Sequence, residues 1–482
     1  MKVPTPIYPS LTKNKFAALA FSLSLALPLW AQTENTPATQ PVPGLAGVET
    51  SAAAPETYDP GTNSDRMMTP PPVSGQTYPI TLGSQERANY LHAGLSFTTT
   101  YMDNALGGLT THPVSDISYS VFPTLALDET TSRLHFDLAY APGYTFYDRT
   151  GDLSSANQNA AIQFEYRLSP HVTFSARDSL QKTSNIFNQP PDLLSAGGIG
   201  GGAQGPNFSV IAPIADMLSN SGNAGISYQY ALNDMIGGSG TFSNLHYFNQ
   251  AQVPGLGDSN SQAGLAFYSH RFGNGQYLGA TYQYQRLLAY PAQGINETQT
   301  HAAFFFYTVA PASSRFSLSL FGGPQYSDTV QPPVHSVQLQ STELKSWNPA
   351  AGASLGWQGR LTSFALSYTH ITSSGSGLIG AVKLDSAMLS ARQQLTRTLS
   401  ASVTGGYAQN EVIGAALLGA PSGHTISGTA SLQQQFGQHL NVQLGYTRLH
   451  QSYGNIQAIA ANPNTNREFV SISYQFSRPI GR

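Results

Sequence analysis

The chain has 482 residues, of which only 10% are charged, and its formal net charge is −3. Ordinary soluble proteins carry about 25% charged residues, and a net charge this small gives no electrostatic support for binding nucleic acid. The chain has no cysteine, which excludes disulfides and thiolate metal sites.

The N-terminal region predicts export across a membrane. Lys2, Lys13 and Lys15 precede an apolar run at 16–30, so residues 1–31 are expected to be a secretory signal peptide. A membrane anchor is the alternative, although the run is short for a spanning helix. Residues 32–88 are rich in Pro, Ala and Thr, and we expect a flexible periplasmic linker. The sequence leaves open whether this linker is free or docks inside or beneath the domain that follows.

From residue 89 to residue 482 the sequence alternates between apolar and polar residues. Clear examples are 133–147, 160–168 and 172–180, and the last is the C-terminal stretch 468–482. We count about eighteen segments of about ten residues with period two and no competing helical period. This pattern predicts an all-β domain of about eighteen strands, with sixteen as the alternative count.

The connections between these segments alternate between short and long. Short ones include "SPH" at 169–171 and "GNG" at 273–275, whereas 187–221, 328–346 and 450–466 are long. Tight turns on one side and long loops on the other are typical of a closed, up-and-down antiparallel barrel that spans a membrane. A β-propeller is the main soluble alternative. In a barrel the C-terminal strand must close the sheet against the strand near residue 91, because backbone groups in lipid have to be paired.

The C-terminal strand carries Tyr474 and Phe476 and resembles the end of bacterial outer-membrane β-barrel proteins, although "SRPIGR" follows here. The size and the neutral Ser, Gln and Tyr composition are also loosely similar to barrel porins associated with polysaccharide export. The resemblance implies a location in the bacterial outer membrane, in contact with lipid and lipopolysaccharide. It also implies dependence on the barrel assembly machinery, and contact of the N-terminal linker with periplasmic export components.

The alternation also predicts which side chains face the lumen. With Leu138 and Phe164 toward lipid, charged residues on three consecutive strands point inward, and the "SPH" turn sets Arg167 almost opposite Thr173. These charges either brace the wall or form a transverse field at a constriction, as in porins. The inward candidates are Asp137, Glu165, Arg167 and Arg177, with His270 and Arg392 as further ones.

The longest loop, 187–221, is the third external one, and the third loop narrows the pore in general porins. Either it folds inward or it is a mobile surface loop. The motif "GASLG" around Ser354 matches a nucleophile elbow, but it lies inside an alternating strand rather than at a strand-to-helix turn. No metal or cofactor motif is present, so we expect no cofactor and no enzymatic activity.

These observations predict a porin-like channel for passive passage or export of neutral and polar solutes, polysaccharide included. The alternative is a structural or adhesive outer-membrane barrel with an occluded lumen. A hydrolase with His370 or His450 near a rim is a third and weaker reading.

Overall fold

The structure is a computed structural model. It describes residues 67–70, 89–106, 112–184, 215–249, 256–273, 275–290, 294–311, 315–331, 342–374, 381–413, 422–437, 439–453 and 464–479. The expected signal peptide 1–31, most of the linker 32–88 and residues 187–214 of the longest loop lie outside the described residues. Within the described ranges, no helix is both long and apolar enough to cross a membrane.

Strands make up nearly all of the described chain, and one short 3₁₀ helix, η1 (Gly151–Leu153), follows the third strand. The strands are β1 (Tyr90–Met102), β2 (Asp116–Thr130), β3 (Leu134–Tyr147), β4 (Ser155–Arg167), β5 (Val172–Thr183), β6 (Met217–Ala231), β7 (Asp234–Tyr247), β8 (Asp258–Phe272), β9 (Gln276–Tyr290), β10 (Asn296–Val309), β11 (Phe316–Gln331), β12 (Thr342–Gln358), β13 (Thr362–Ser374), β14 (Ala381–Gln394), β15 (Leu399–Val412), β16 (Gly423–Phe436), β17 (Leu440–Tyr453) and β18 (Asn464–Pro479).

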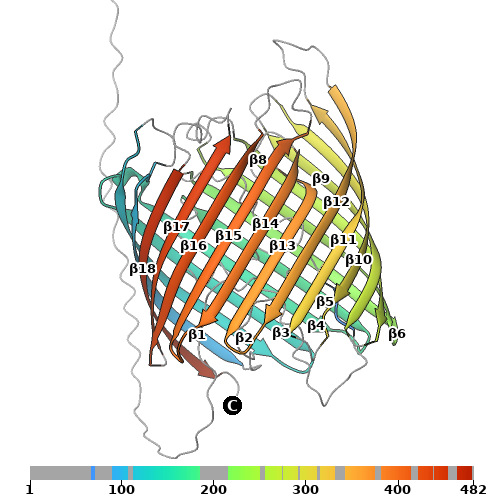
Figure 1. Ribbon diagram of the computed structural model, residues 1–482, viewed down its shortest axis with the longest axis horizontal. Coiled ribbons are helices and arrows are strands. Elements are labelled where there is room, and N and C mark those ends of the chain that lie inside the picture. Colours follow the sequence, from blue (N-terminus) through green and yellow to red (C-terminus); the bar gives the residue numbers. More distant parts are fainter. Residues whose placement is uncertain are drawn as a thin grey trace, which may run out of the picture. The chain divides into compact units, whose positions relative to one another are not determined.

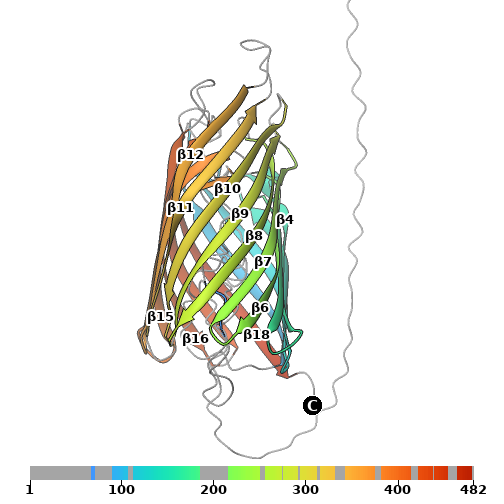
Figure 2. The ribbon, with the colours of Figure 1, turned by 90° about the vertical axis from the view of Figure 1, so that its right-hand side faces the viewer.

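The strands form one closed antiparallel sheet of eighteen strands (Figures 1 and 2). Each strand pairs with its neighbours in the chain, and β1 pairs with both β2 and β18. The register of the closing pair runs from Tyr90↔Pro479 to Met102↔Arg467. The predicted fold class, the count of eighteen rather than sixteen, and the closing role of the terminal strand are therefore confirmed.

Both ends of the strand series lie at the same end of the barrel, together with the short turns. Tyr90 of β1 is opposite Pro479 of β18 and opposite Asp128, which is close to the β2–β3 turn. We call this the turn end and the opposite one the loop end. In outer-membrane barrels short turns are periplasmic and longer loops are extracellular.

The two faces of the sheet differ in chemistry because side chains alternate along each strand. On β17, Leu444 points outward and is 55% exposed, whereas Gln443 beside it points to the lumen and donates a hydrogen bond to Ser431. The lumen side of the closing pair carries small hydroxyl residues, and Thr98 donates to Ser471 over 2.9 Å. The outward positions predicted for Leu138 and Phe164 agree with this alternation.

Several strands extend further toward the loop end than the alternation indicates. β6 begins at Met217, so the predicted loop 187–221 ends earlier, and β11 and β12 leave only 332–341 of the predicted loop 328–346. Likewise β17 and β18 leave 454–463 of 450–466. The strand ends break the pattern of apolar residues outside and polar residues inside. On β12 the outward Glu343 and Lys345 are charged, whereas the inward Leu344 packs in an apolar cluster.

Candidate functional site

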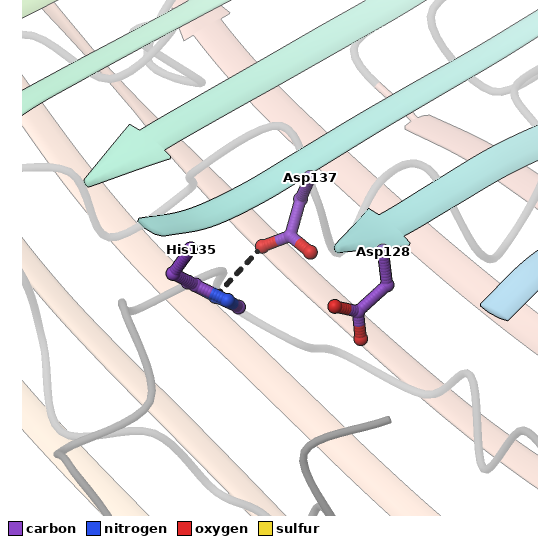
Figure 3. Close-up of side chains that lie close together, drawn as sticks. All are labelled: Asp128, His135 and Asp137. Atoms are coloured by element: carbon purple, nitrogen blue, oxygen red, sulfur yellow. Dashed lines mark ion pairs between the residues drawn. The ribbon is translucent and has the colours of Figure 1, made fainter. Parts of the chain in front are cut away.

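One wall of the lumen carries a group of charged side chains near the turn end. The β2–β3 turn sets Asp128 opposite Asp137 and Thr130 opposite His135. His135 Nε2 lies 3.0 Å from Asp137 Oδ2 (Figure 3). Thr130 Oγ1 lies 2.9 Å from His135 Nδ1. Because these residues come from two strands joined by a three-residue connection, their arrangement is fixed locally by the hairpin.

The group continues across β4 and β5. His135 is opposite Glu165, and Asp137 is opposite Gln163. Gln163 is in turn opposite Arg177, which donates from Nη2 to Gln163 Oε1 over 2.9 Å. The amide of Gln163 thus stands between the Asp137 carboxylate and the Arg177 guanidinium.

The predicted register between β4 and β5 is confirmed. Arg167 is directly opposite Thr173, as the "SPH" turn indicated, and Glu165 and Arg177 are offset by two residues across the β4–β5 pair. We name the whole group the charged wall. Its members are Asp128, His135, Asp137, Glu165, Arg167 and Arg177. Whether it stands at the narrow point of the lumen stays a prediction.

The charged wall has a small excess of negative charge. Asp128, Asp137 and Glu165 contribute −3, and Arg167 and Arg177 contribute +2, which leaves −1 with His135 neutral. Like charges directly opposite each other on antiparallel strands repel. The hydrogen bonds from Thr130 to Asp128 (3.3 Å) and between His135 and Asp137 offset part of that repulsion.

Asp128, His135 and Asp137 also bring three possible metal-ligand atoms within 4.8 Å of one another. Carboxylate oxygen and imidazole nitrogen are ligands that Zn²⁺ accepts. The direct His135–Asp137 contact explains the same closeness without an ion. The geometry is therefore compatible with either a hydrogen-bonded brace or a divalent cation.

The lumen face of β7 to β10 carries a cluster of a different kind, and part of the expected linker packs on it. Met67 is 5% exposed and packs against buried apolar side chains of these four strands, which we call the apolar wall. The backbone N–H of Met67 donates to Gln229 Oε1 over 3.0 Å, and that of Met68 donates to the hydroxyl of Tyr277 over 3.5 Å. The wall residues are Met235, Phe267, Tyr277 and Phe306. For residues 67–70, the alternative in which the linker docks inside the barrel is the one observed.

A second apolar cluster lies at the loop end and joins opposite parts of the wall. Tyr247 of β7 and Leu256 pack with Val382 of β14, Val412 of β15 and Tyr453 of β17. The Tyr453 hydroxyl accepts a 2.8 Å hydrogen bond from Asn410. Because β7 and β14 to β17 are distant in the strand order, this cluster narrows the lumen at the loop end.

The two further inward candidates have different outcomes. His270 shares its side of β8 with the exposed Tyr268 and Phe272, so the prediction that it faces the lumen is wrong. It lies 2.7 Å from Asp234 at the turn-end rim, on the outward face. The inward residue is its neighbour Arg271. The assignment failed because a polar His at the membrane boundary resembles a lumen position.

Arg392 does point to the lumen. It is 6% exposed, lies opposite the buried Ser363, and its Nη2 is 3.4 Å from Ser400 Oγ. It is on β14 and is not part of the charged wall. Ser354 lies in the middle of β12, opposite Ser319 and Ser367, so it is not on a strand-to-helix turn.

Asp128 is the member of the charged wall that the sequence reading missed. It belongs to "DETTS" at 128–132, which the apolar alternation assigns to the connection between two strands. β2 instead continues to Thr130, and this extension pairs Asp128 with Asp137 and Thr130 with His135.

The outward face shows where the barrel resides. Aromatic side chains gather near both ends of the strands, with Trp357, Phe436 and Tyr474 exposed at the turn end and Trp347, Phe146 and Tyr101 exposed at the loop end. Apolar side chains such as Leu444 and Val403 cover the surface between them. A closed barrel with an apolar band between two aromatic girdles is built to span a bilayer. The protein is an outer-membrane β-barrel.

Comparison with protein-family models and with curated proteins finds no match. Among solved structures, the barrel is similar to OccK2 (OpdF) of Pseudomonas aeruginosa, with 11% identity and a TM-score of 0.40 over 81% of this chain and 98% of that chain. It is also similar to Pseudomonas aeruginosa OpdK with vanillate, at 10% identity and a TM-score of 0.39 over 80% and 99% of the chains. A third is the ferric citrate transporter FecA in its unliganded form, at 8% identity and a TM-score of 0.39 over 82% and 79%.

Proposed function

We propose that the protein is a passive outer-membrane channel for small polar solutes. The observation that carries the proposal is the combination of eighteen strands with a lumen lined by hydroxyl and amide side chains. Barrels of about 16–18 strands are wide enough to leave an aqueous channel, whereas eight-stranded ones are filled by their own side chains.

The chemistry of the lining supports neutral solutes. Hydroxyl pairs such as Ser120–Thr145 (2.9 Å) and Ser402–Ser431 (2.7 Å) line neighbouring strands, and amides such as Gln285 stand among them. Such groups exchange hydrogen bonds with sugar hydroxyls without holding ions. Neutral oligosaccharides, including segments of an exported polysaccharide, are therefore the finer solute class that we propose. Periplasmic export components meeting the N-terminal linker, lipopolysaccharide and the assembly machinery are the proposed partners.

The charged wall has two readings within this function. It either braces the β2–β5 part of the barrel or sets a local field that a permeating ion senses. The hydrogen bond from Arg177 to Gln163 and the contact of His135 with Asp137 support bracing. The excess of one negative charge supports weak cation preference.

A structural barrel with an occluded lumen is the second candidate, and specific observations favour it. The apolar cluster around Tyr453 narrows the loop end, and Met67 occupies the lumen near the turn end. If both contacts persist in the membrane, the passage between them is restricted.

A flux assay separates the two functions. Purified full-length protein in liposomes is challenged with neutral sugars and with charged oligosaccharides of matched size. A channel admits the neutral sugars faster than protein-free liposomes do, with a cut-off set by size. Equal rates with and without protein for every solute would reject the channel and favour the structural barrel.

A further inference from the structure

The barrel wall contains a seam between β12 and β13 near the loop end. The paired register of these strands runs only from Ala351↔His370 to Gln358↔Ser363. β12 continues beyond Ala351 to Thr342 and stays paired with β11 along this stretch. In Figure 1, β11 and β12 rise above the neighbouring strands. On its other edge, residues 347–350 of β12 have no register with the described residues 371–374 of β13.

The seam lies at membrane depth. Trp347 and Trp357 are both outward-facing and exposed on β12, at 71% and 41%. They are ten residues apart, which matches the roughly 9–11 residues with which a strand crosses the bilayer. Trp347 also packs against Tyr326 of β11, with ring centroids 5.1 Å apart. The stretch from Trp347 to Ala350 is thus inside the outer leaflet, where irregular backbone is tolerated only beside protein or a cavity.

The sequence explains why the pairing stops at Ala351. Pro349 of β12 lies opposite Pro324 of β11. Two prolines can face each other only at a non-hydrogen-bonded pair, where the backbone nitrogens point away from the partner strand. The Pro349 nitrogen therefore points away from β11 and toward β13. It has no hydrogen to donate there. Continuing the β12–β13 register would place Thr372 opposite Pro349.

Thr372 is held elsewhere, inside the lumen. Its backbone N–H donates to the side-chain Oε1 of Gln325 on β11 over 3.0 Å, and both residues are buried. β13 contacts β8 and β9, and Leu287 of β9 packs with Ala381 at the start of β14. The described loop-end residues of β13 and β14 therefore lean inward, which separates β13 from β12 and narrows the direct route through this end of the lumen.

An aromatic track leads along the lumen wall toward the seam. It begins at the apolar wall near the turn end and continues through Phe304 and Phe321, whose rings meet at 5.5 Å. The Phe321 ring lies over Gly352, where an added Cβ would be 2.2 Å from the ring. Gly352 is next to Ala351, the last paired residue of β12. The rings of this track offer burial to an acyl or aromatic group inside an otherwise polar lumen.

We infer that the seam is a lateral opening through which a single-chain amphiphile passes between the lumen and the outer leaflet. Its acyl or aromatic part would follow the track ending at Phe321, and its polar head would stay among the hydroxyl and amide side chains of the lumen. The inference rests on the proposed channel for the polar part of the route. It adds a ligand class and an exit that a simple pore does not have.

The opening itself is tested by disulfide trapping in the full-length protein, which has no native cysteine. Ser354→Cys with Ser367→Cys joins residues that are directly opposite in the paired part. Asn348→Cys with Ser373→Cys is the matched pair on the continued register, also facing the lumen. We expect the first pair to oxidise readily in membranes and the second at least tenfold less. Equal oxidation of both pairs would show a closed wall and overturn the inference.

The ligand class is tested with a photoreactive benzoylphenylalanine and a radiolabelled 14-carbon lysophosphatidylcholine in phosphatidylcholine liposomes. The residue replaces Phe321 on the track, Val403 on the lipid face, or Ser402 in the lumen beside an intact wall. Crosslinking at Phe321 should approach that at Val403 and exceed that at Ser402 at least fivefold. Crosslinking at Phe321 as weak as at Ser402 would reject the lateral route.

These readouts are independent of the proposed channel. Lipid crosslinking at Phe321 without any sugar flux would reject the proposed channel and support the lateral opening. Sugar flux with no crosslinking at Phe321 would support the channel and reject the lateral opening. Heat-modifiable migration on gels checks that every variant is a folded barrel.

Discussion

Neutralising both arginines of the charged wall should shift ion selectivity toward cations. Arg167→Gln with Arg177→Gln leaves the three carboxylates in place, so the local charge changes from −1 to −3. Each added negative charge attracts a monovalent cation about 8 Å away by about 0.5 kcal/mol in water before screening. With a Debye length of about 10 Å at 0.1 M salt, about 0.2 kcal/mol per charge remains.

Two such charges attract cations and repel anions, so the combined bias is about 0.9 kcal/mol, or about fivefold in permeability ratio at 0.1 M. At 1 M salt the Debye length is about 3 Å, and the ratio should change by only about 1.3-fold. Reversal potentials in planar bilayers under a salt gradient measure both values. The matched control is Arg286→Gln, since Arg286 pairs with Glu297 at 2.7 Å on the outward face. An unchanged reversal potential at low salt would show that permeating ions do not pass close to the charged wall.

Three further outcomes are expected. Leu444→Arg on the lipid face should lower the free energy of unfolding by about 2–4 kcal/mol if the site is near midplane, whereas Gln443→Arg on the lumen face should lower it far less. Equal decreases in the free energy of unfolding, measured by urea titration, would contradict the face assignment. Met67→Asp should release its segment, because a carboxylate cannot be solvated among apolar side chains, and a cysteine at Thr69 should then react with maleimide at least tenfold faster. A single cysteine within 187–221 should be labelled on intact cells, and one in a short turn only after permeabilisation; the reverse pattern would invert the topology.

The barrel was predictable because its strands obey one simple rule. Alternation between outward residues such as Leu444 and inward ones such as Gln443 repeats wherever a strand crosses lipid. The rule loses its force where both faces meet water or protein. The loop-end extensions of β11 and β12 were missed for that reason, and His270 was assigned to the wrong face at the opposite rim.

The sequence pattern could not predict the contacts between segments that are distant along the chain. The alternation placed Asp137, Glu165 and Arg177 on neighbouring strands, because hairpin register is a local property. Docking of Met67 on the apolar wall depends instead on a segment with no periodicity of its own. The seam beside Pro349 depends on the position of the end of β13, which a hydrogen bond from Thr372 to Gln325 fixes over the lumen face of β12.

Single-channel recording of the purified full-length protein shows whether the barrel conducts ions. A channel predicts discrete, reproducible current steps with little ion selectivity, and larger steps once Met67→Asp frees the lumen near the turn end. Bilayers that stay silent for folded wild-type and Met67→Asp protein alike would contradict the channel and leave a barrel with an occluded lumen.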